Sequence, residues 1–317
     1  MQDGISSEGR RLQDAITKYH FGDAIRILDA GFDLSQHVAP GYRALDYAAA
    51  MGNLEVCAEL IQRGAEVNYQ IDFETGGEYD FGPSALHRAA ERAYPAIVEL
   101  LLSNGADPNA VTFGGARALH YAVGNNFNFN RWVKSAQLLL QYGADPNAVM
   151  DRWTDSRHWT NQRGYSKTHG NIPLFITPLH AALETSEGFQ ANQGGAPRNE
   201  VRGHPCGGAN VIKALLDHGA DPHFMPAEAS KVYLTPFQQA LNQAPAEDIE
   251  LMFSHAPVDL GQRTIAGKTL TQLTTGRPAA RALLMSWKTT ASLANTVADP
   301  LADAQPSRSM RASAPPL

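Results

Sequence analysis

The chain has 317 residues, a formal net charge of -6 and 43% hydrophobic residues. This charge excludes a global basic field, so we expect neither nucleic acid nor a membrane as a partner. Two cysteines cannot form a disulfide framework, and no segment reaches the roughly 18 apolar residues of a membrane-spanning helix. The first residues lack the apolar run of a secretory signal, which favours a cytoplasmic location or export by a signal-peptide-independent route.

Four segments along the chain end in nearly the same turn. They are RGAEVN (63–68), NGADPN (104–109), YGADPN (142–147) and HGADPH (218–223). Each follows a run rich in Leu and Ile, and upstream of these runs lie ALDYAA (44–49), ALHRAA (85–90), ALHYAV (118–123) and TPLHAAL (177–183). Each upstream motif and the apolar run after it are therefore expected to form two short helices, which the glycine turn closes.

The spacing of these segments is regular. Eighteen residues separate Asp46 from Gly64, and the same number separates His87 from Gly105. Fifteen residues then lead from Gly105 to His120, which gives a period of 33, and insertions explain the longer intervals. In this period and in its T-P-L-H-x-A-like motif the chain resembles the ankyrin-repeat family over residues 8–288.

The resemblance implies an all-α fold, an ankyrin-repeat solenoid of helix-turn-helix units with extended finger loops. Seven units are expected, near residues 8–38, 40–70, 82–111, 114–149, 175–223, 234–260 and 266–288. The terminal units depart most from the motif, as capping units do. Residues 289–317, rich in Ala, Ser, Pro and Asp, are predicted to form a disordered tail, or a short helix with a flexible end.

The third unit illustrates why this pattern folds. Residues 85–90 place small apolar side chains on one side of a first helix, and residues 97–102 give a second helix a broad apolar stripe. Gly105 is expected in a left-handed helix cap, a conformation that glycine adopts without a Cβ penalty. Because a lone unit cannot cover its apolar face, neighbouring units must stack.

Two polar positions recur in the motif. One position holds histidine in three units, as His87, His120 and His180. The resemblance implies that these histidines hydrogen-bond backbone groups that link units, rather than act in catalysis or metal binding. The other position holds asparagine in three units, as Asn68, Asn109 and Asn147. The resemblance implies that these asparagines close the finger turn in the same way.

Two insertions after the glycine turns lengthen the fingers and carry residue types that are common at binding hot spots. The first, residues 69–81, is acidic and contributes the candidates Phe73, Tyr79 and Phe81. The second, residues 150–175, is mainly basic and contributes Arg152, Trp153, Arg157, Trp159, Arg163 and Tyr165. Arg92, in the third unit, completes the candidate set. We expect two arms of opposite charge that clamp a partner protein, or alternatively arms that pack on each other or on the solenoid.

Residue sets that could support chemistry are sparse. Insertions at 124–132 and 184–208 fall between the helices of a unit, and the second is typical of a mobile loop. In the second of these, His204 and Cys206 lack the further ligands of a zinc site. In residues 150–175, His158 and His169 beside Asp151 and Asp155 are interpreted as a solvated polar loop rather than a metal or acid–base site. Nucleotide-binding glycine motifs are missing as well. We expect no catalytic residue, no metal and no cofactor.

The sequence therefore favours a non-enzymatic protein–protein interaction module, present as a monomer. It would bind another protein through its concave face and the finger insertions 69–81 and 150–175. Bacterial ankyrin proteins that this chain resembles include secreted effectors, immunity-type inhibitors of toxins and regulators of a neighbouring enzyme. Two alternatives remain open: an enzyme or small-ligand-binding protein with its site in residues 150–175, and a purely structural scaffold.

Overall fold

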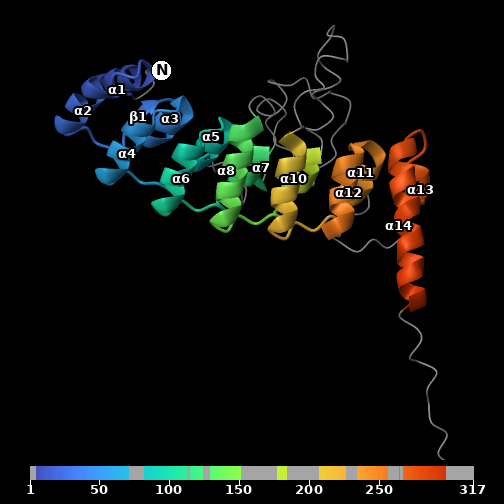
Figure 1. The fold of residues 1–317 in the computed structure, drawn as a ribbon. Helices are drawn as coiled ribbons and strands as arrows, with labels where there is room; N and C mark the ends of the chain where they lie inside the picture. The colour runs from blue at the N-terminus through green and yellow to red at the C-terminus, as the bar shows by residue number, and fades with distance from the viewer. Residues whose placement is uncertain are drawn as a thin grey trace, which may run out of the picture.

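The computed structural model describes residues 5–70, 82–112, 115–123, 129–150, 177–183, 207–225, 234–255, 264 and 267–297. Helical hairpins stand side by side in a row from one end of the molecule to the other (Figure 1). The first helices of the hairpins are α1 (Ser7–Thr17), α3 (Ala44–Met51), α5 (Ala85–Glu91), α7 (Ala118–Val123), the helical residues 178–183, α11 (Pro236–Gln243) and α13 (Leu270–Leu273). The second helices are α2 (Phe21–Asp29), α4 (Leu54–Gln62), α6 (Pro95–Ser103), α8 (Phe129–Gln141), α10 (Gly207–Asp217), α12 (Ala246–His255) and α14 (Pro278–Val297).

First and second helices form separate layers. In one layer α5 contacts both α3 and α7, and in the other α8 contacts both α6 and α10. A short antiparallel hairpin of β1 (His37–Ala39) and β2 (Tyr42–Arg43) precedes α3 and packs against α1 and α3. This stack of helical hairpins confirms the predicted all-α solenoid, and the strand pair is the first of its fingers.

The first helices begin with a shared hydrogen-bond arrangement. Before α5, the backbone N–H of Ser84 donates to Nδ1 of His87, with 3.2 Å between the nitrogens. Before α11, the backbone N–H of Thr235 donates to Oε1 of Gln238, which occupies the position of the histidine. The side chain at this position thus satisfies an N–H that has no partner inside the helix. The motif histidine therefore helps to start its own helix.

Glycine ends the second helices as predicted. Gly105 has a φ of +84°, and its equivalents Gly64, Gly143 and Gly219 have φ values of +85°, +87° and +89°. This left-handed conformation lets the backbone N–H groups after the helix bond to its last carbonyls, as Gly105 does to Leu102. The chain then turns sharply toward the next finger.

Asparagine side chains tie each glycine turn to the next one. Nδ2 of Asn109 donates to the carbonyl of Gly143, and Oδ1 of Asn109 accepts from the backbone N–H of Asp145, both over 2.8 Å. Asn68 and Asn147 make the same two bonds to the glycine and aspartate of the following turn. We call this series the asparagine ladder. It links four successive turns along one edge of the array.

The prediction that these asparagines close their own turn is wrong about their partner. Aspartate closes the turn instead, since Oδ1 of Asp107 accepts from the backbone N–H of Asn109 over 2.8 Å. Asp145 and Asn147 repeat this contact. Because the local N–H is already bonded to the aspartate, the amide of the asparagine is left to bond the neighbouring unit.

The core lies between the two layers. Ala89 and Ala122 of the first helices and Leu101 and Leu139 of the second helices have no exposed surface. Alanine lets the first helices approach closely, and leucine fills the space between layers. Complete burial of one such leucine contributes about 1.5–3 kcal/mol to stability.

Aromatic side chains close the C-terminal part of the array. The ring of Phe253 stacks on Trp287 of α14, with centroids 5.0 Å apart, and meets Phe237 of α11 edge-on at 5.2 Å. Trp287 therefore packs α14 against the preceding unit. Helix α14 continues through residues 289–297, which the sequence assigns to the tail.

Candidate partner-binding face

Most of the candidate binding residues lie outside the part of the chain that the structure describes. They are Phe73, Tyr79, Phe81, Arg152, Trp153, Arg157, Trp159, Arg163 and Tyr165. The clamp formed by the two finger insertions therefore stays a prediction. Arg92 is described: it caps the C-terminal end of α5, and its side chain is exposed.

A second set of binding-type residues lies on the first helices themselves. Tyr47 in α3, Arg88 in α5 and Tyr121 in α7 directly follow the motif position, and each is partly exposed beside buried neighbours. Further tyrosines and arginines lie next to them on the fingers and helix ends. We call the surface made by Tyr42, Arg43, Tyr47, Tyr69, Arg88, Arg92, Arg117 and Tyr121 the arginine–tyrosine face.

Stacked rings and cations hold the centre of this face. The rings of Tyr42 and Tyr47 meet edge-on, with centroids 5.9 Å apart. The guanidinium carbon of Arg88 lies 4.8 Å from the centroid of the Tyr42 ring, within the range of a cation–π contact. This contact joins α5 to the finger before α3, so it crosses a unit boundary. The Tyr47 hydroxyl reaches back to the hydroxyl of Thr17 over 3.0 Å.

The next finger adds a second stack. The guanidinium carbon of Arg43 lies 3.4 Å from the centroid of the Tyr69 ring, and its Nη1 donates to Oε2 of Glu66 over 2.6 Å. The Tyr69 hydroxyl and Nε2 of His37 are 3.1 Å apart. The Tyr69 ring and the Glu66 carboxylate together therefore fix the direction of the Arg43 side chain.

Tyr121 extends the face to α7. Its ring meets His87 edge-on with centroids 5.5 Å apart, and its hydroxyl lies 3.2 Å from the hydroxyl of Thr112 on the finger. Burial raises the pKa of the Tyr121 phenol. The ring is thus held by its own unit and by the preceding one, which makes this part of the face rigid.

Sequence reasoning missed this face apart from Arg92. The available signal was the position directly after the motif residue, which holds Tyr47, Arg88 and Tyr121 in successive units. Such a position projects from the first helix while the residues around it are buried. This regularity lies within the repeats, whereas the candidates named from the sequence lie mainly in the insertions.

The motif histidines link units, as the resemblance implied. Nε2 of His87 donates to the carbonyl of Ala110 on the next finger over 3.0 Å, and Nε2 of His180 does the same to Leu234. Burial lowers the pKa of His87 to about 3 and that of His180 to about 4. Both rings therefore stay neutral at physiological pH, with one nitrogen donating and the other accepting.

Asp46 takes the histidine position in α3. Its Oδ2 accepts from the backbone N–H of Arg43 over 3.3 Å, so it still caps the helix. Its Oδ1 is buried and has no hydrogen-bond partner within the described part of the chain. Burial raises the pKa of Asp46 to about 7, against the attraction of Arg88 and Arg43. Asp46 thus caps its helix as the histidines do, but it does not make their hydrogen bond to the next finger.

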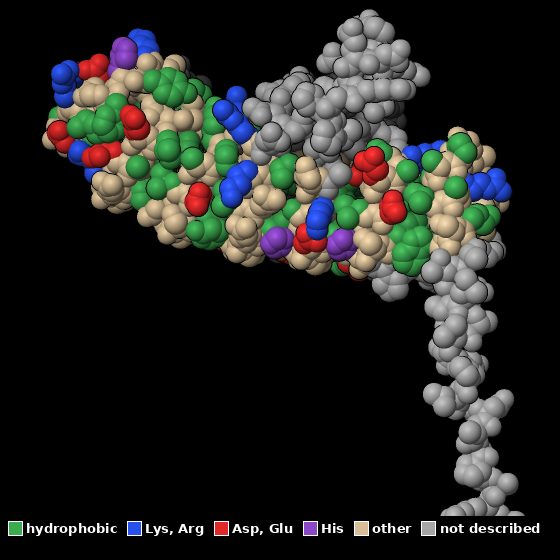
Figure 2. Space-filling model, viewed as in Figure 1, with side chains coloured by type: hydrophobic (Ala, Val, Ile, Leu, Met, Phe, Trp, Pro, Cys, Tyr) green, Lys and Arg blue, Asp and Glu red, His purple; other side chains and the backbone are tan. Residues whose placement is uncertain are grey.

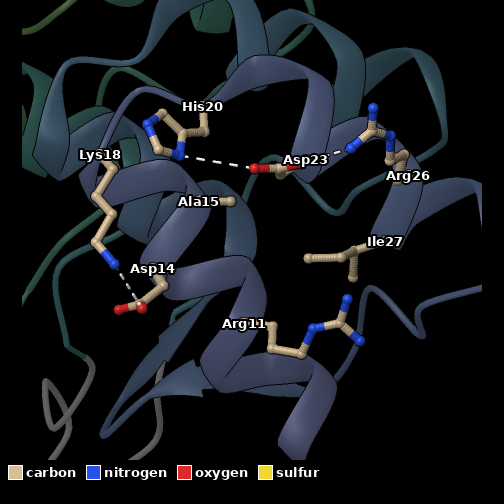
Figure 3. A pocket seen from close by; sticks show the side chains of 8 residues that line it. All are labelled: Arg11, Asp14, Ala15, Lys18, His20, Asp23, Arg26 and Ile27. Atoms are coloured by element: carbon tan, nitrogen blue, oxygen red, sulfur yellow. Dashed lines mark hydrogen bonds and ion pairs between the residues drawn. The ribbon is translucent and has the colours of Figure 1, made fainter.

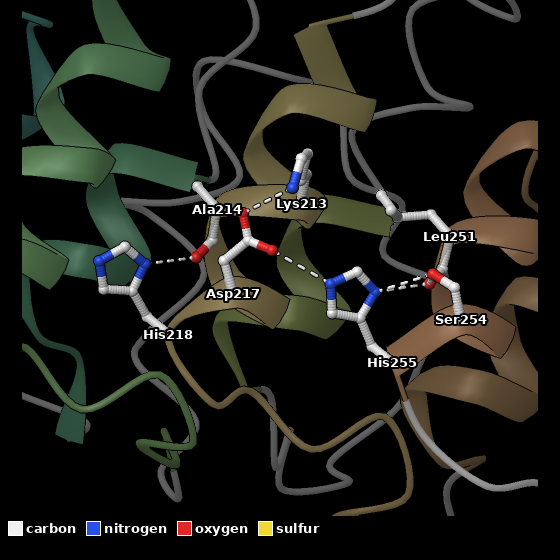
Figure 4. Close-up of polar contacts among 7 residues, drawn as sticks. All are labelled: Lys213, Ala214, Asp217, His218, Leu251, Ser254 and His255. Carbon is white, nitrogen blue, oxygen red and sulfur yellow. Dashed lines mark hydrogen bonds and ion pairs between the residues drawn. The ribbon is translucent and has the colours of Figure 1, made fainter.

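The opposite face is different in character. Figure 2 shows the layer that contains α6, α8, α10 and α12, where basic and acidic side chains are interspersed with hydrophobic ones. Between α10 and α12, Asp217 accepts from Lys213 over 2.7 Å and lies 3.1 Å from Nε2 of His255 (Figure 4). The hydrogen bonds from Lys213 and then His255 hold the pKa of Asp217 below its usual value. The contact ties two neighbouring helices together.

Ser254, His255 and Asp217 have the order of a catalytic triad but not its chemistry. The Ser254 hydroxyl lies 3.0 Å from Nδ1 of His255 (Figure 4). That nitrogen also lies 2.9 Å from the carbonyl of Leu251, which can only accept a hydrogen bond. An Nδ1 that donates its proton there cannot take one from the serine. Arg63 and Asp29 likewise join α4 to α2, over 2.7 Å.

A hollow of about 370 Å³ lies between α1 and α2 (Figure 3). Two of its basic side chains bond its two aspartates: Lys18 bonds Asp14 over 2.9 Å, and Arg26 bonds Asp23 over 2.9 Å, whereas Arg11 points toward Ile27. Because these four charges pair with one another, they do not converge on a common ligand position.

Among the described residues, no three His, Cys, Asp or Glu side chains are grouped so that they could hold a metal ion. None of the helices in that part of the chain is both long and apolar enough to cross a membrane. His158, His169, His204 and Cys206 lie outside it.

Comparison with known proteins agrees with this geometry. Residues 67–150 match the family model for ankyrin repeats in three copies, and residues 41–72 match the model for a single ankyrin repeat. A putative ankyrin repeat-containing protein of Treponema pallidum is 40% identical over 97 residues, which are 31% of this chain and 30% of that protein. Palmitoyltransferase AKR1 of Lachancea kluyveri is 28% identical over 177 residues, 56% of this chain and 22% of that protein. The chain thus spans less than a third of the length of these relatives.

A solved structure extends the likeness to most of the chain. The human ASB11 ankyrin repeat domain superposes with a TM-score of 0.56 over 87% of this chain and 96% of that one, at 18% identity. This likeness concerns the fold. Together with the repeat motifs and the two-layer stack, it establishes that the chain is an ankyrin-repeat protein, a class of domain that generally serves protein–protein interaction.

Proposed function

We propose that this protein is a non-enzymatic binding module that receives a partner protein on its arginine–tyrosine face. The observation that supports it most directly is the row of Tyr47, Arg88 and Tyr121 on successive first helices. Tyrosine and arginine are enriched at interface hot spots, and their conformations here are fixed by stacking. A preformed surface loses little side-chain entropy when it binds.

The finger insertions would border this face. Residues 69–81 and 150–175 follow the turns at Asn68 and Asn147, so their ends are attached where the asparagine ladder runs. In our proposal they extend the contact made by the rigid face. Sequestration, inhibition or regulation of the bound protein needs no catalytic group, which fits an effector, immunity or regulatory role.

Quantitative capture tests this function. Proteins captured from an extract of the source cells by the wild-type chain are compared with those captured by Arg88→Ala/Tyr121→Ala and by a chain lacking residues 150–173. A matched control, Lys213→Ala, alters the opposite layer. We expect a specific protein to be retained by the wild type and the control but lost from the face variant. If all four chains retain the captured protein equally, the arginine–tyrosine face is not its binding site.

A further inference from the structure

Arginine dominates the charge of the arginine–tyrosine face. Its basic groups are Arg43, Arg88, Arg92 and Arg117. The acidic groups on the described first helices α3, α5 and α7 and the adjoining residues 37–43, 66–70, 82–84, 110–112 and 115–117 are Asp46, Glu66 and Glu91. Asp46 is buried, so two carboxylates that are not buried, exposed Glu66 and half-buried Glu91, share the face with four guanidinium groups. This local excess of positive charge stands in a chain whose net charge is -6.

The guanidinium groups are oriented but incompletely paired. Arg88 rests against the Tyr42 ring, and its Nη1 forms an ion pair with Oε2 of Glu91 over 3.6 Å, a distance longer than a hydrogen bond. A guanidinium held against a ring keeps its N–H edges available for acceptors in its own plane. The ring therefore prepares Arg88 to meet a planar acceptor such as a carboxylate.

Arg117 has more donors without an acceptor than Arg88 has. Its Nε and Nη1 are buried and have no hydrogen-bond partner among the described residues, and Nε of Arg88 is in the same state. Buried donors without acceptors are costly to a fold. Rearrangement onto an incoming carboxylate would supply the missing acceptors, with two parallel N–H···O bonds at each guanidinium.

We propose that the arginine–tyrosine face recognises an acidic segment of the partner protein, whose Asp or Glu carboxylates pair with Arg88 and Arg117. The proposal rests on the binding function above and adds the chemistry of the partner. The rings of Tyr42 and Tyr47 then pack against the aliphatic and backbone parts of that segment. Such a surface selects by charge sign, since a basic segment meets more repulsion from the four arginines than attraction from the two glutamates.

An acidic peptide fits these observations better than a nucleic acid. Phosphates also pair with arginine, but nucleic-acid surfaces carry basic groups along an extended path, whereas here the basic groups alternate with tyrosines and glutamates. The overall negative charge of the chain would further repel a polyanion as long as a nucleic acid.

Fluorescence polarisation with a labelled peptide of ten glutamates tests the proposal, with a peptide of ten glutamines as the neutral control. Arg88→Gln/Arg117→Gln is compared with Arg11→Gln/Arg26→Gln, which removes the same charge from α1 and α2. We expect the face variant to bind the acidic peptide at least tenfold more weakly and the control variant to lose less than twofold. Affinity should also fall as salt is added.

Three results would overturn the proposal: equal binding of both peptides, equal loss in both variants, or tighter, equally arginine-dependent binding of a ten-nucleotide single-stranded DNA. Circular dichroism melts check that each variant is folded. If the face variant does not fold, the exposed Arg92→Gln and the charge-preserving Arg88→Lys replace it, and unchanged affinity in both counts against the proposal.

Competition separates this inference from the function on which it rests. The glutamate peptide is added to the captured partner complex. Displacement of the partner supports acidic recognition. A partner whose capture depends on Arg88 and Tyr121 but resists the peptide refutes the acidic segment and leaves the binding function intact. A chain whose captured proteins do not depend on these residues refutes both.

Discussion

Replacing Asp46 by Asn should make the array more stable at neutral and alkaline pH. Asp46 is 3% exposed, and burial raises its pKa from 3.8 to about 7. The folded state thus holds a proton that the unfolded state has lost, so stability is full below pH 3.8 and falls as the pH rises to about 7. Between pH 3.8 and about 7 the free energy of unfolding falls by 1.36 kcal/mol per pH unit, a total loss of about 4 kcal/mol above pH 7.

Asparagine imitates the protonated acid in shape and charge, so this loss should be absent from Asp46→Asn. Urea unfolding followed by circular dichroism at pH 4, 6 and 8 measures the difference between the two proteins. We expect near equality at pH 4 and an advantage of up to about 4 kcal/mol for the variant at pH 8. His87 and His180 have lowered pKa values and destabilise the fold as the pH falls below 6.5, but they do so in both proteins.

The difference between the curves therefore isolates Asp46. A variant that is less stable than the wild type at pH 8 would show that the charged carboxylate is stabilised by Arg43 and Arg88. A difference that stays constant from pH 4 to pH 8 would show that Asp46 does not titrate in this range. Either result would refute the reasoning from burial.

Three further comparisons between variants test the scaffold by thermal or urea unfolding. Gly105→Val should cost about 1–3 kcal/mol from backbone strain alone, because open space surrounds its Cβ position, and Gly105→Asn should cost less. Gly52→Ala should cost more than Gly105→Ala, because the new Cβ would lie 2.5 Å from the Tyr94 ring, and Tyr94→Ala should remove the excess. Asn109→Ala removes two ladder bonds and should lower the free energy of unfolding by about 1–3 kcal/mol. Asn104 bonds only within its own hairpin, so Asn104→Ala should lower it less, and equal losses would contradict the role of the ladder.

The scaffold could be predicted because its determinants are local. Gly105 forms a left-handed turn and His87 caps its own helix, and both of these contacts lie within a few residues in the sequence. Their spacing in the sequence therefore carries the information. The same is true of alanine in the first helices, where the period reveals the buried side.

The arginine–tyrosine face could not be derived in this way. Arg88 stacks on Tyr42 and Arg43 on Tyr69, contacts between residues that belong to different structural elements. Whether a side chain at such a position bends toward a neighbouring ring depends on the distance between units, which no single motif contains. The partners of the asparagine ladder could not be predicted for the same reason, because the carbonyl groups that accept its hydrogen bonds lie in the following unit.

The asparagine ladder also bears on how such a protein can change over evolutionary time. Its bonds join Asn68 to Gly105 across 37 positions and Asn147 to Gly219 across 72, with the same geometry. A doubling of the intervening chain adds only about 0.6 kcal/mol of closure entropy. Insertions between the bonded turns can therefore lengthen, shorten or be exchanged at small cost. Natural variation could in this way alter the fingers while the register of the helices is inherited unchanged.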